Sequence, residues 1–187
     1  NYPPFSFWKP ERVHELDAAI GRAPRPGTSL GVYAHIPFCR KRCHFCYFKV
    51  YTDKDSKAIR RYIDALIAEL TIYAAKPFIG GRKVDFVYFG GGTPSYLSVD
   101  QLRVLTDAMK KLLPWDQVEE VTFEAEPGTL TDPKLKAIRD LGVTRLSLGV
   151  ENFNDHILEI NGRAHRSPEV FRAYEYARSL GFPQINI

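Results

Sequence analysis

The sequence of 187 residues contains only three cysteines, and all of them fall between Cys39 and Cys46. An odd, tightly clustered set of cysteines is a poor disulfide framework, so we expect a reducing compartment and a ligand role for the thiols. No apolar run approaches the roughly 20 residues that a membrane-spanning helix needs. The start, Asn1-Tyr2-Pro3-Pro4, lacks the basic-then-apolar pattern of a signal peptide. These absences predict a cytoplasmic protein with no membrane partner.

An excess of charge is also missing, because the formal net charge is only +4. A charge this small and this dispersed does not indicate a nucleic-acid partner. The densest basic run, Arg40-Lys41-Arg42, lies inside the cysteine cluster, which suggests a local role. Hydrophobic residues make up 44% of the chain and charged residues 26%, as in a globular protein with its own core. A small-molecule substrate is the expected partner.

Strand and helix patterns alternate from Gly31 onward, whereas residues 1–30 read as an N-terminal extension and linker. The extension includes a short helix predicted at 11–20. Strands are predicted at 31–36, 85–89, 120–124, 145–150 and 184–187, and helices at 56–75, 98–113, 131–141, 153–160 and 167–180. This alternation predicts an α/β fold with a parallel sheet and right-handed crossovers. Because the last strand only begins before Ile187, we expect the core at 31–187 to be incomplete.

Polar loops follow four of the predicted strands. The cysteines follow the first strand, three glycines at 90–92 the second, Glu126-Pro127-Gly128 the third and Glu151-Asn152 the fourth. The carboxyl ends of parallel strands meet at one edge of a sheet, and sites lie on the loops that leave it. The sequence therefore predicts that these four loops converge on one mouth.

The cysteine loop has the spacing Cys39-x-x-x-Cys43-x-x-Cys46, which can bring three sulfurs around one small object. A complete [4Fe–4S] cluster takes four thiolates, so a cluster held here would have one iron without a cysteine. Catalytic metal sites keep such an open position for substrate. The basic residues at 40–42 would offset the negative charge of a thiolate-ligated cluster.

Two simpler interpretations of the cysteines stay open. A zinc site could recruit His44 or His35 as a fourth ligand, although structural zinc sites usually pair two cysteine knuckles and the sequence has one. The three thiols could also be packing residues, since free cysteine behaves as a small hydrophobe. The histidines, His165 included, are otherwise expected to be structural or close to the cluster.

The segment Tyr33-Ala34-His35-Ile36-Pro37-Phe38-Cys39 through Cys46 resembles the radical SAM superfamily. It is most similar to the branch of oxygen-independent coproporphyrinogen III oxidase, which also includes class C methylases, cyclopropanases and haem chaperones. Further matches, in order, are Gly90-Gly91-Gly92-Thr93-Pro94-Ser95, Glu124 before Glu126-Pro127, Leu148-Gly149-Val150 and Asn161-Gly162-Arg163. The resemblance implies a partial (βα)6 barrel, truncated after about four βα units. It also implies a [4Fe–4S] cluster whose open iron is chelated by S-adenosylmethionine (SAM).

The resemblance further implies a reaction and an electron donor. An electron from a reduced flavodoxin or ferredoxin would split SAM, and the resulting deoxyadenosyl radical would abstract hydrogen from a small-molecule substrate. Some relatives hold two SAM molecules, the second of which can donate a methyl or methylene group.

Cofactor-binding roles carry over to the residues that match the motifs. These residues are Tyr33, Phe45, Gly91, Gly92, Thr93, Glu124, Glu151 and Arg163, beside the cluster ligands Cys39, Cys43 and Cys46. The ring of Phe45 could stack on adenine, and the glycines let the backbone approach the amino-acid moiety of SAM. Glu124 could accept hydrogen bonds from ribose or ammonium, and Arg163 could bind a carboxylate in bidentate fashion. The structural alternatives are loop packing for Phe45, a tight turn for the glycines, a surface salt bridge for Glu124 and a solvated helix position for Arg163.

Two positions depart from the pattern of the coproporphyrinogen enzymes. Phe48 stands where they carry a further cysteine, and Glu151 stands where relatives commonly have glutamine. An ionised carboxylate cannot donate a hydrogen bond but can pair with a cation. We therefore predict a radical SAM enzyme that performs methyl transfer or cyclopropanation with a second SAM. The alternatives are a coproporphyrinogen III oxidase or related haem chaperone and, in another class, a zinc-stabilised binding module.

Overall fold

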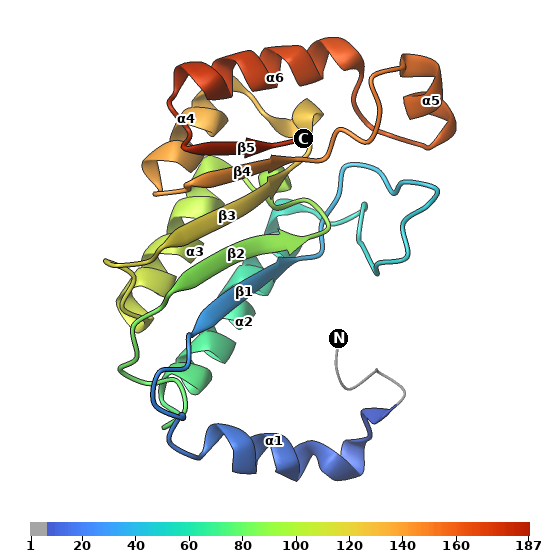
Figure 1. Ribbon diagram of the computed structural model, residues 1–187. Helices are drawn as coiled ribbons and strands as arrows, with labels where there is room; N and C mark the ends of the chain where they lie inside the picture. The colour runs from blue at the N-terminus through green and yellow to red at the C-terminus, as the bar shows by residue number, and fades with distance from the viewer. Residues whose placement is uncertain (1–6) are drawn as a thin grey trace.

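The computed structural model describes residues 7–187, and a five-stranded parallel sheet lies at its centre (Figure 1). The strands are β1 (Gly31–Ile36), β2 (Phe86–Gly91), β3 (Glu120–Ala125), β4 (Arg145–Leu148) and β5 (Gln184–Asn186). They pair in the order of the sequence, and all four pairings are parallel. Sequential parallel strands joined by right-handed crossovers place their helices on one side, as in a barrel. The prediction of an α/β fold with a partial barrel is confirmed.

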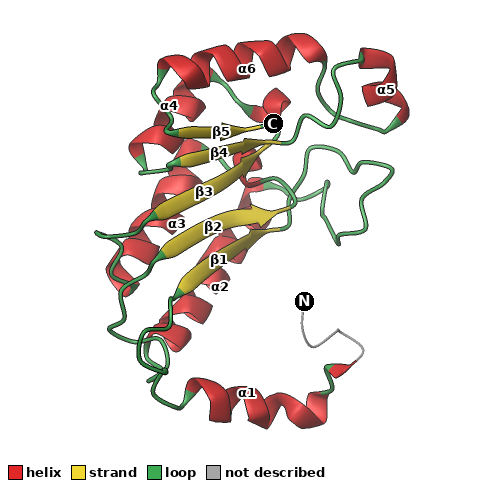
Figure 2. Cartoon of the chain, viewed as in Figure 1, coloured by secondary structure: helices red, strands yellow, loops and turns green. Residues whose placement is uncertain are grey.

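Four helices cover one face of this sheet (Figure 2). They are α2 (Ser56–Ala74), α3 (Val99–Leu112), α4 (Asp132–Asp140) and α6 (Ser167–Ser179). The helices pack side by side in chain order, and their apolar side chains form one continuous core with the strands. On the other face the sheet carries polar and aromatic side chains that stay partly exposed, among them Tyr33, Tyr88 and Glu124.

Local capping explains where the helices begin. Ser98, the predicted cap of α3, accepts a hydrogen bond from the Gln101 amide at 3.2 Å, and the Gln101 side chain accepts one from the Ser98 amide at 2.9 Å. This reciprocal pair satisfies two amides that the first turn leaves unpaired. The short helix α5 (Asp155–Ile160) begins after Asn154, whose side chain caps it in the same manner.

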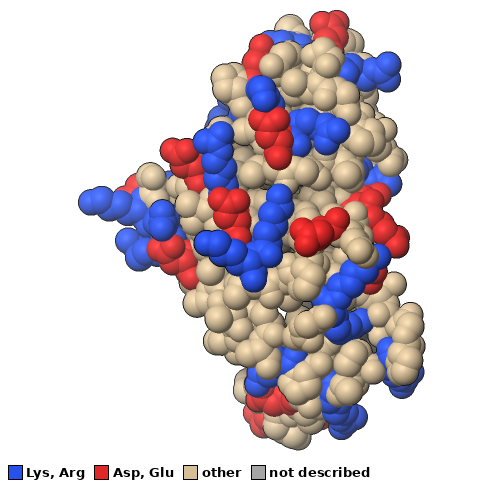
Figure 3. Space-filling model, turned by 90° about the vertical axis from the view of Figure 1, so that its left-hand side faces the viewer, with Lys and Arg blue, Asp and Glu red and all other residues tan. Residues whose placement is uncertain are grey.

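The N-terminal segment stands apart from the sheet in Figure 1. A 3-10 turn, Pro10–Arg12, leads into α1 (Val13–Ile20), so the helix predicted at 11–20 begins two residues later than expected. The chain start at Asn1–Pro4 lies outside the described residues. Within 7–187, no helix is long and apolar enough to cross a membrane. On the face shown in Figure 3, basic and acidic side chains are intermixed.

Two strands end at positions that the sequence pattern does not predict. β2 continues through Gly90 and Gly91, which were expected to be a loop, because the two residues pair with His35 and Ile36 of β1. β4 ends at Leu148, two residues early. The chain turns there, since the amide of Val150 donates to the Leu148 carbonyl at 2.9 Å. Both changes occur at the carboxyl edge, where the predicted site lies.

Candidate functional site

A cavity of about 360 Å³ opens at the carboxyl edge of the sheet. Its volume lies in the range of small-molecule sites, which is about 300 to 1,000 Å³. The lining comes from the loops after β1, β2, β3 and β4 and from the segment that follows α5. Among the lining residues are Cys39, Cys43, Phe45, Cys46, Gly91, Gly92, Thr93, Glu124, Glu151 and Arg163. The structure thus brings together all of the predicted site residues except Tyr33.

The three thiols have different surroundings. Cys39 is buried and accepts a hydrogen bond from the Thr93 hydroxyl at 3.3 Å. Cys43 accepts one from Nη1 of Arg163 at 3.0 Å, whereas Cys46 is half-buried. Burial raises the pKa of the Cys39 thiol, and this effect outweighs the hydrogen bond from Thr93, which lowers it. Because metal binding requires thiolates, binding here would release the Cys39 proton.

The arrangement of potential ligands does not match a single metal ion. Within residues 7–187, no group of three or more His, Cys, Asp or Glu side chains is close enough to hold one. The Nδ1 atom of His44 is hydrogen-bonded to the Ile160 carbonyl oxygen at 2.7 Å, and Nδ1 of His35 to the Tyr33 hydroxyl at 3.2 Å. Both contacts engage Nδ1 only, and what counts against a zinc site is that no ligand group is close enough within residues 7–187. Thiols spread around one cavity fit a larger, multi-atom cluster better.

The segment that contains Gly91 and Gly92 packs directly against the loop at 39–46 that carries the three cysteines. The amide of Gly92 donates to the Ile36 carbonyl at 2.8 Å. A Cβ atom added at Gly92 would lie 2.9 Å from the sulfur of Cys39 and 3.0 Å from the carbonyl oxygens of Ile36 and Phe38. Gly91 has a φ of +111°, which favours glycine. The missing side chain of Gly92 therefore lets this segment lie against the cysteine loop, and its approach to the amino-acid moiety of SAM stays a prediction.

Glu124 is held in place by two donors at the floor of the cavity. The hydroxyl of Tyr88 donates to Oε1 at 2.6 Å, and the amide of Gly91 donates to Oε2 at 3.2 Å. Burial and the hydrogen bond to Glu124 raise the pKa of Tyr88. Carboxylate oxygens accept more than one hydrogen bond each, so Glu124 can still bind a hydroxyl or an ammonium group. The sequence did not identify Tyr88, because strand register is needed to place it beside Glu124.

Arg163 links the cysteine loop to the cavity. Its Nη1 atom donates to Cys43 and its Nη2 atom to the Gly149 carbonyl. Its Nε atom is buried and has no hydrogen-bond partner among the described residues. A buried N–H group without a partner is costly, so this donor is prepared for an acceptor such as a carboxylate. Three features fit a [4Fe–4S] cluster with bound SAM. They are the three cysteine thiols, the backbone at Gly91 and Gly92, and the Nε–H of Arg163, which has no partner among the described residues.

The remaining predicted residues lie at the rim of the cavity or below it. Phe45 is at the rim, with 52% of its surface exposed, and Tyr33 lies on β1 with 55% exposed. Tyr33 packs against Tyr88 at a ring distance of 5.8 Å and does not line the cavity. Glu151 has a φ of +66°, the one positive value at a residue other than glycine within 7–187. Such backbone strain is often found at functional sites.

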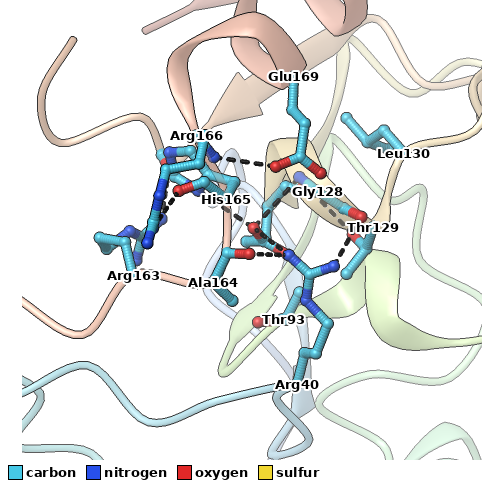
Figure 4. Close-up of polar contacts among 12 residues, drawn as sticks. Arg40, Thr93, Gly128, Thr129, Leu130, Arg163, Ala164, His165, Arg166 and Glu169 are labelled. Atoms are coloured by element: carbon cyan, nitrogen blue, oxygen red, sulfur yellow. Dashed lines mark hydrogen bonds and ion pairs between the residues drawn. The ribbon is translucent and has the colours of Figure 1, made fainter. Parts of the chain in front are cut away.

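Three further residues meet beside the cavity, and sequence reasoning gave them only minor roles. Arg40 and His165 both contact the carboxylate of Glu126 (Figure 4). Arg40 was expected only to offset cluster charge, and His165 was expected to be structural. The position of Glu126 after the third strand was the only available signal.

Comparisons with known proteins agree with this geometry. The family model of the radical SAM superfamily matches residues 33–187. The haem chaperone HemW of Bacillus subtilis (strain 168) is 40% identical over 156 residues, which cover 83% of this chain and 40% of the chaperone. The oxygen-independent coproporphyrinogen III oxidase of Escherichia coli (strain K12) is 35% identical over 170 residues, or 90% of this chain and 36% of the oxidase.

A solved structure shows the same fold. The coproporphyrinogen III oxidase HemN from Escherichia coli superposes with a TM-score of 0.84 at 30% identity, over 97% of this chain and 40% of that one. The chain thus spans about two fifths of the length of these relatives.

Proposed function

Since the chain belongs to the radical SAM superfamily, we propose that it binds a [4Fe–4S] cluster through Cys39, Cys43 and Cys46 and cleaves SAM reductively. The main support is the convergence of the predicted ligands and cofactor-binding residues on one cavity. When bound, such a cluster supplies the electron that breaks a carbon–sulfur bond of SAM chelated at its open iron. A reduced flavodoxin or ferredoxin is the proposed electron donor.

The residues of the cavity have distinct tasks in this proposal. The hydroxyl of Thr93 and the guanidinium of Arg163 each donate to a cysteine sulfur, at 3.3 and 3.0 Å. Hydrogen bonds to ligand sulfurs and nearby positive charge stabilise thiolates and tune a cluster's reduction potential. The free Nε of Arg163 binds the carboxylate of SAM, and Glu124 accepts from its ammonium or ribose groups. Phe45 shields the mouth of the cavity from water.

For the substrate, we propose a tetrapyrrole. The comparisons support the alternative of a coproporphyrinogen oxidase or haem chaperone better than methyl transfer or cyclopropanation. Beside the cavity, the rings of Tyr47 and Phe48 stack at 4.4 Å, and 84% of Tyr47 is exposed. A flat exposed aromatic pair can stack on a conjugated macrocycle. Phe48, which departs from the oxidase pattern, thus belongs to the proposed substrate surface.

Reconstitution of the full-length protein tests the cluster and its reaction. Anaerobic incubation with iron and sulfide should give a brown protein, which releases deoxyadenosine when SAM and dithionite are added. Cys43→Ala should lose cluster and product together, whereas Lys136→Ala, a change in an exposed ion pair with Asp140, should keep both. A reconstituted protein that binds SAM but never cleaves it would refute the proposal.

A second experiment separates the reaction classes. Haem and coproporphyrinogen are each titrated against the full-length protein, and methyl-labelled SAM is supplied in parallel. Haem binding without turnover supports a chaperone, and decarboxylation of coproporphyrinogen supports an oxidase. Transfer of the label to a product would instead support methyl transfer or cyclopropanation. Equilibrium dialysis with labelled SAM gives the number of SAM molecules bound.

A further inference from the structure

An ion-paired network ties the cysteine loop to two distant segments (Figure 4). Arg40 directly follows the first cysteine, and its Nη2 atom lies 3.4 Å from Oε1 of Glu126. The same guanidinium donates to the carbonyl oxygens of Gly128, at 3.2 Å, and of Ala164. A Cβ atom added at Gly128 would collide with it. One side chain of the cysteine loop is thereby attached to the loop after β3 and to the segment after α5.

Glu126 has a second side-chain partner, His165, inside the protein. Nδ1 of His165 lies 3.1 Å from Oε1 of Glu126, and Nε2 lies 3.2 Å from the Val150 carbonyl oxygen. The imidazole is 0% exposed. A carboxylate and a carbonyl oxygen only accept hydrogen bonds, so both contacts are satisfied when both ring nitrogens carry protons. Burial acts to raise the pKa of Glu126, but the hydrogen bond with His165 and the charge of Arg40 outweigh it, and the pKa is lowered.

Glu126 is fixed by its own backbone as well. Its amide donates to the Ser95 hydroxyl at 3.0 Å, and its Oε1 atom accepts from the Gly128 amide at 3.1 Å. Its side chain is only 10% exposed. Exposed ion pairs contribute little to stability, whereas removing one partner of a buried pair leaves the other charge uncompensated. The carboxylate of Glu126 is therefore held in place on several sides, and the partly exposed side chain of Arg40 pairs with it.

The other end of the cysteine loop is anchored to the same segment after α5. The amide of His44 donates to the Asn161 carbonyl at 3.0 Å, and its imidazole contacts the Ile160 carbonyl at 2.7 Å. A Cβ atom at Gly162 would lie 2.9 Å from the His44 ring, so only glycine leaves room for it. Arg40 directly follows Cys39 and His44 directly follows Cys43, so each of the first two cysteines is followed by an anchored residue.

We propose that Arg40, Glu126 and His165 are positioning residues that hold the Cys39–Cys46 loop in its ligand-binding shape before any iron is bound. The inference rests on the proposed function, because the task of the loop is to receive a cluster. The network reaches the loop through the side chain of Arg40 and contacts none of the three sulfurs. The network therefore affects the cysteine ligands indirectly, because it fixes the course of the backbone between them.

Hydrogen exchange of the full-length protein, purified without iron, tests the proposal. Glu126→Gln removes the charge and keeps the shape. Glu120→Gln is the matched control, since Glu120 begins the same strand and accepts from Arg145 at 2.6 Å at its opposite end. We expect amide exchange at 39–46 to rise about tenfold in Glu126→Gln, because one partner of a buried pair is lost. The control should leave this segment unchanged. Equal exchange in both variants and the parent protein overturns the proposal.

Arg40→Met provides a second variant, chosen because the Arg40 side chain is 41% exposed and we expect the variant to fold. It should reproduce the faster loop exchange, and after reconstitution it should take up iron more slowly and broaden the EPR signal of the reduced cluster. If amide exchange at 39–46 is the same in Arg40→Met as in the parent protein, the proposal is also overturned, even if Glu126→Gln does not fold. Because exchange is measured without a cluster, its outcome is independent of whether SAM is cleaved.

Discussion

Gly92→Ala adds one methyl group where the loop after β2 meets the cysteine loop. The new Cβ would lie 2.9 Å from the Cys39 sulfur, whereas ordinary contact begins at 3.4 Å. The sulfur would therefore have to move by about 0.5 Å, which exceeds the tolerance of about 0.2 Å for metal–ligand distances. The other two neighbours are backbone carbonyl oxygens at 3.0 Å and cannot rotate away. We expect the variant to lose most of its cluster-binding capacity.

The same substitution should also lower stability. Overpacking a dense site costs about 1 to 3 kcal/mol, and a domain of this size loses about 2 to 4 °C in Tm per kcal/mol. The expected fall in Tm of the cluster-free protein is thus about 2 to 12 °C. Gly142→Ala is the matched control, because a Cβ there meets nothing within 4 Å but the φ of +98° is strained. Strain of about 1 to 2 kcal/mol should lower its Tm by about 2 to 8 °C.

Iron content after anaerobic reconstitution separates the two variants. Gly142→Ala should bind iron as the parent protein does, although it is less stable, whereas Gly92→Ala should not. Thermal unfolding is followed by circular dichroism on both cluster-free proteins. A Gly92→Ala protein with unchanged Tm and full iron content would show that the cysteine loop yields to the methyl group, and the reasoning would be refuted.

Three further predictions concern the carboxylates. Tyr88→Phe removes a donor to Glu124 at 2.6 Å and should weaken SAM binding about threefold to tenfold in calorimetry, since bonds to charged groups are among the stronger ones. Glu151→Gly relieves a φ of +66° and should leave Tm unchanged or higher, because relief of about 1 to 2 kcal/mol exceeds the entropic cost of about 0.5 to 1 kcal/mol. Folding lowers the pKa of Glu126. The contribution of this carboxylate to stability is therefore present above its unfolded pKa and is lost as the pH falls through its folded pKa. The Tm difference between the parent protein and Glu126→Gln should accordingly shrink on acidification from pH 7.

The sequence predicted which loops form the site because that conclusion needs only the order of the elements. Parallel strands place their carboxyl ends at one edge, so residues as far apart as Cys39 and Glu151 were expected to lie near one another, whereas Arg163 was assigned to the site by the family resemblance alone. The order of the elements does not tell which residues of neighbouring strands pair with each other. β2 runs on through Gly90 because β1 supplies partners there, although local propensity disfavours glycine in strands.

Tyr33 shows what the missing register changes. The structure pairs Tyr33 with Tyr88, and Tyr88 in turn with Thr122. Tyr33 therefore lies one side-chain level below Glu124, toward the amino ends of the strands, since side chains on one face recur every two residues. Its ring approaches the site only through the space above Gly90, where an added Cβ would lie 3.1 Å from it. A Cβ on Gly90 would lie 3.1 Å from Oε2 of Glu124 as well, so the ring of Tyr33 is close to this carboxylate, and its contact with the cofactor stays a prediction.

The cysteine spacing specifies three ligands but does not by itself determine their arrangement. The loop that carries them has an isolated bridge, Phe38 to Tyr51, and no strand or helix of its own between residues 39 and 46. Its course depends on partners roughly 90 to 120 residues away, of which Arg163 donates to Cys43, lines the cavity and has a buried Nε without a partner among the described residues. Any shift of the segment after α5 therefore moves a cysteine contact and a cofactor contact together. Cluster binding and SAM binding should accordingly be coupled through Arg163, and a substitution in that segment should affect both.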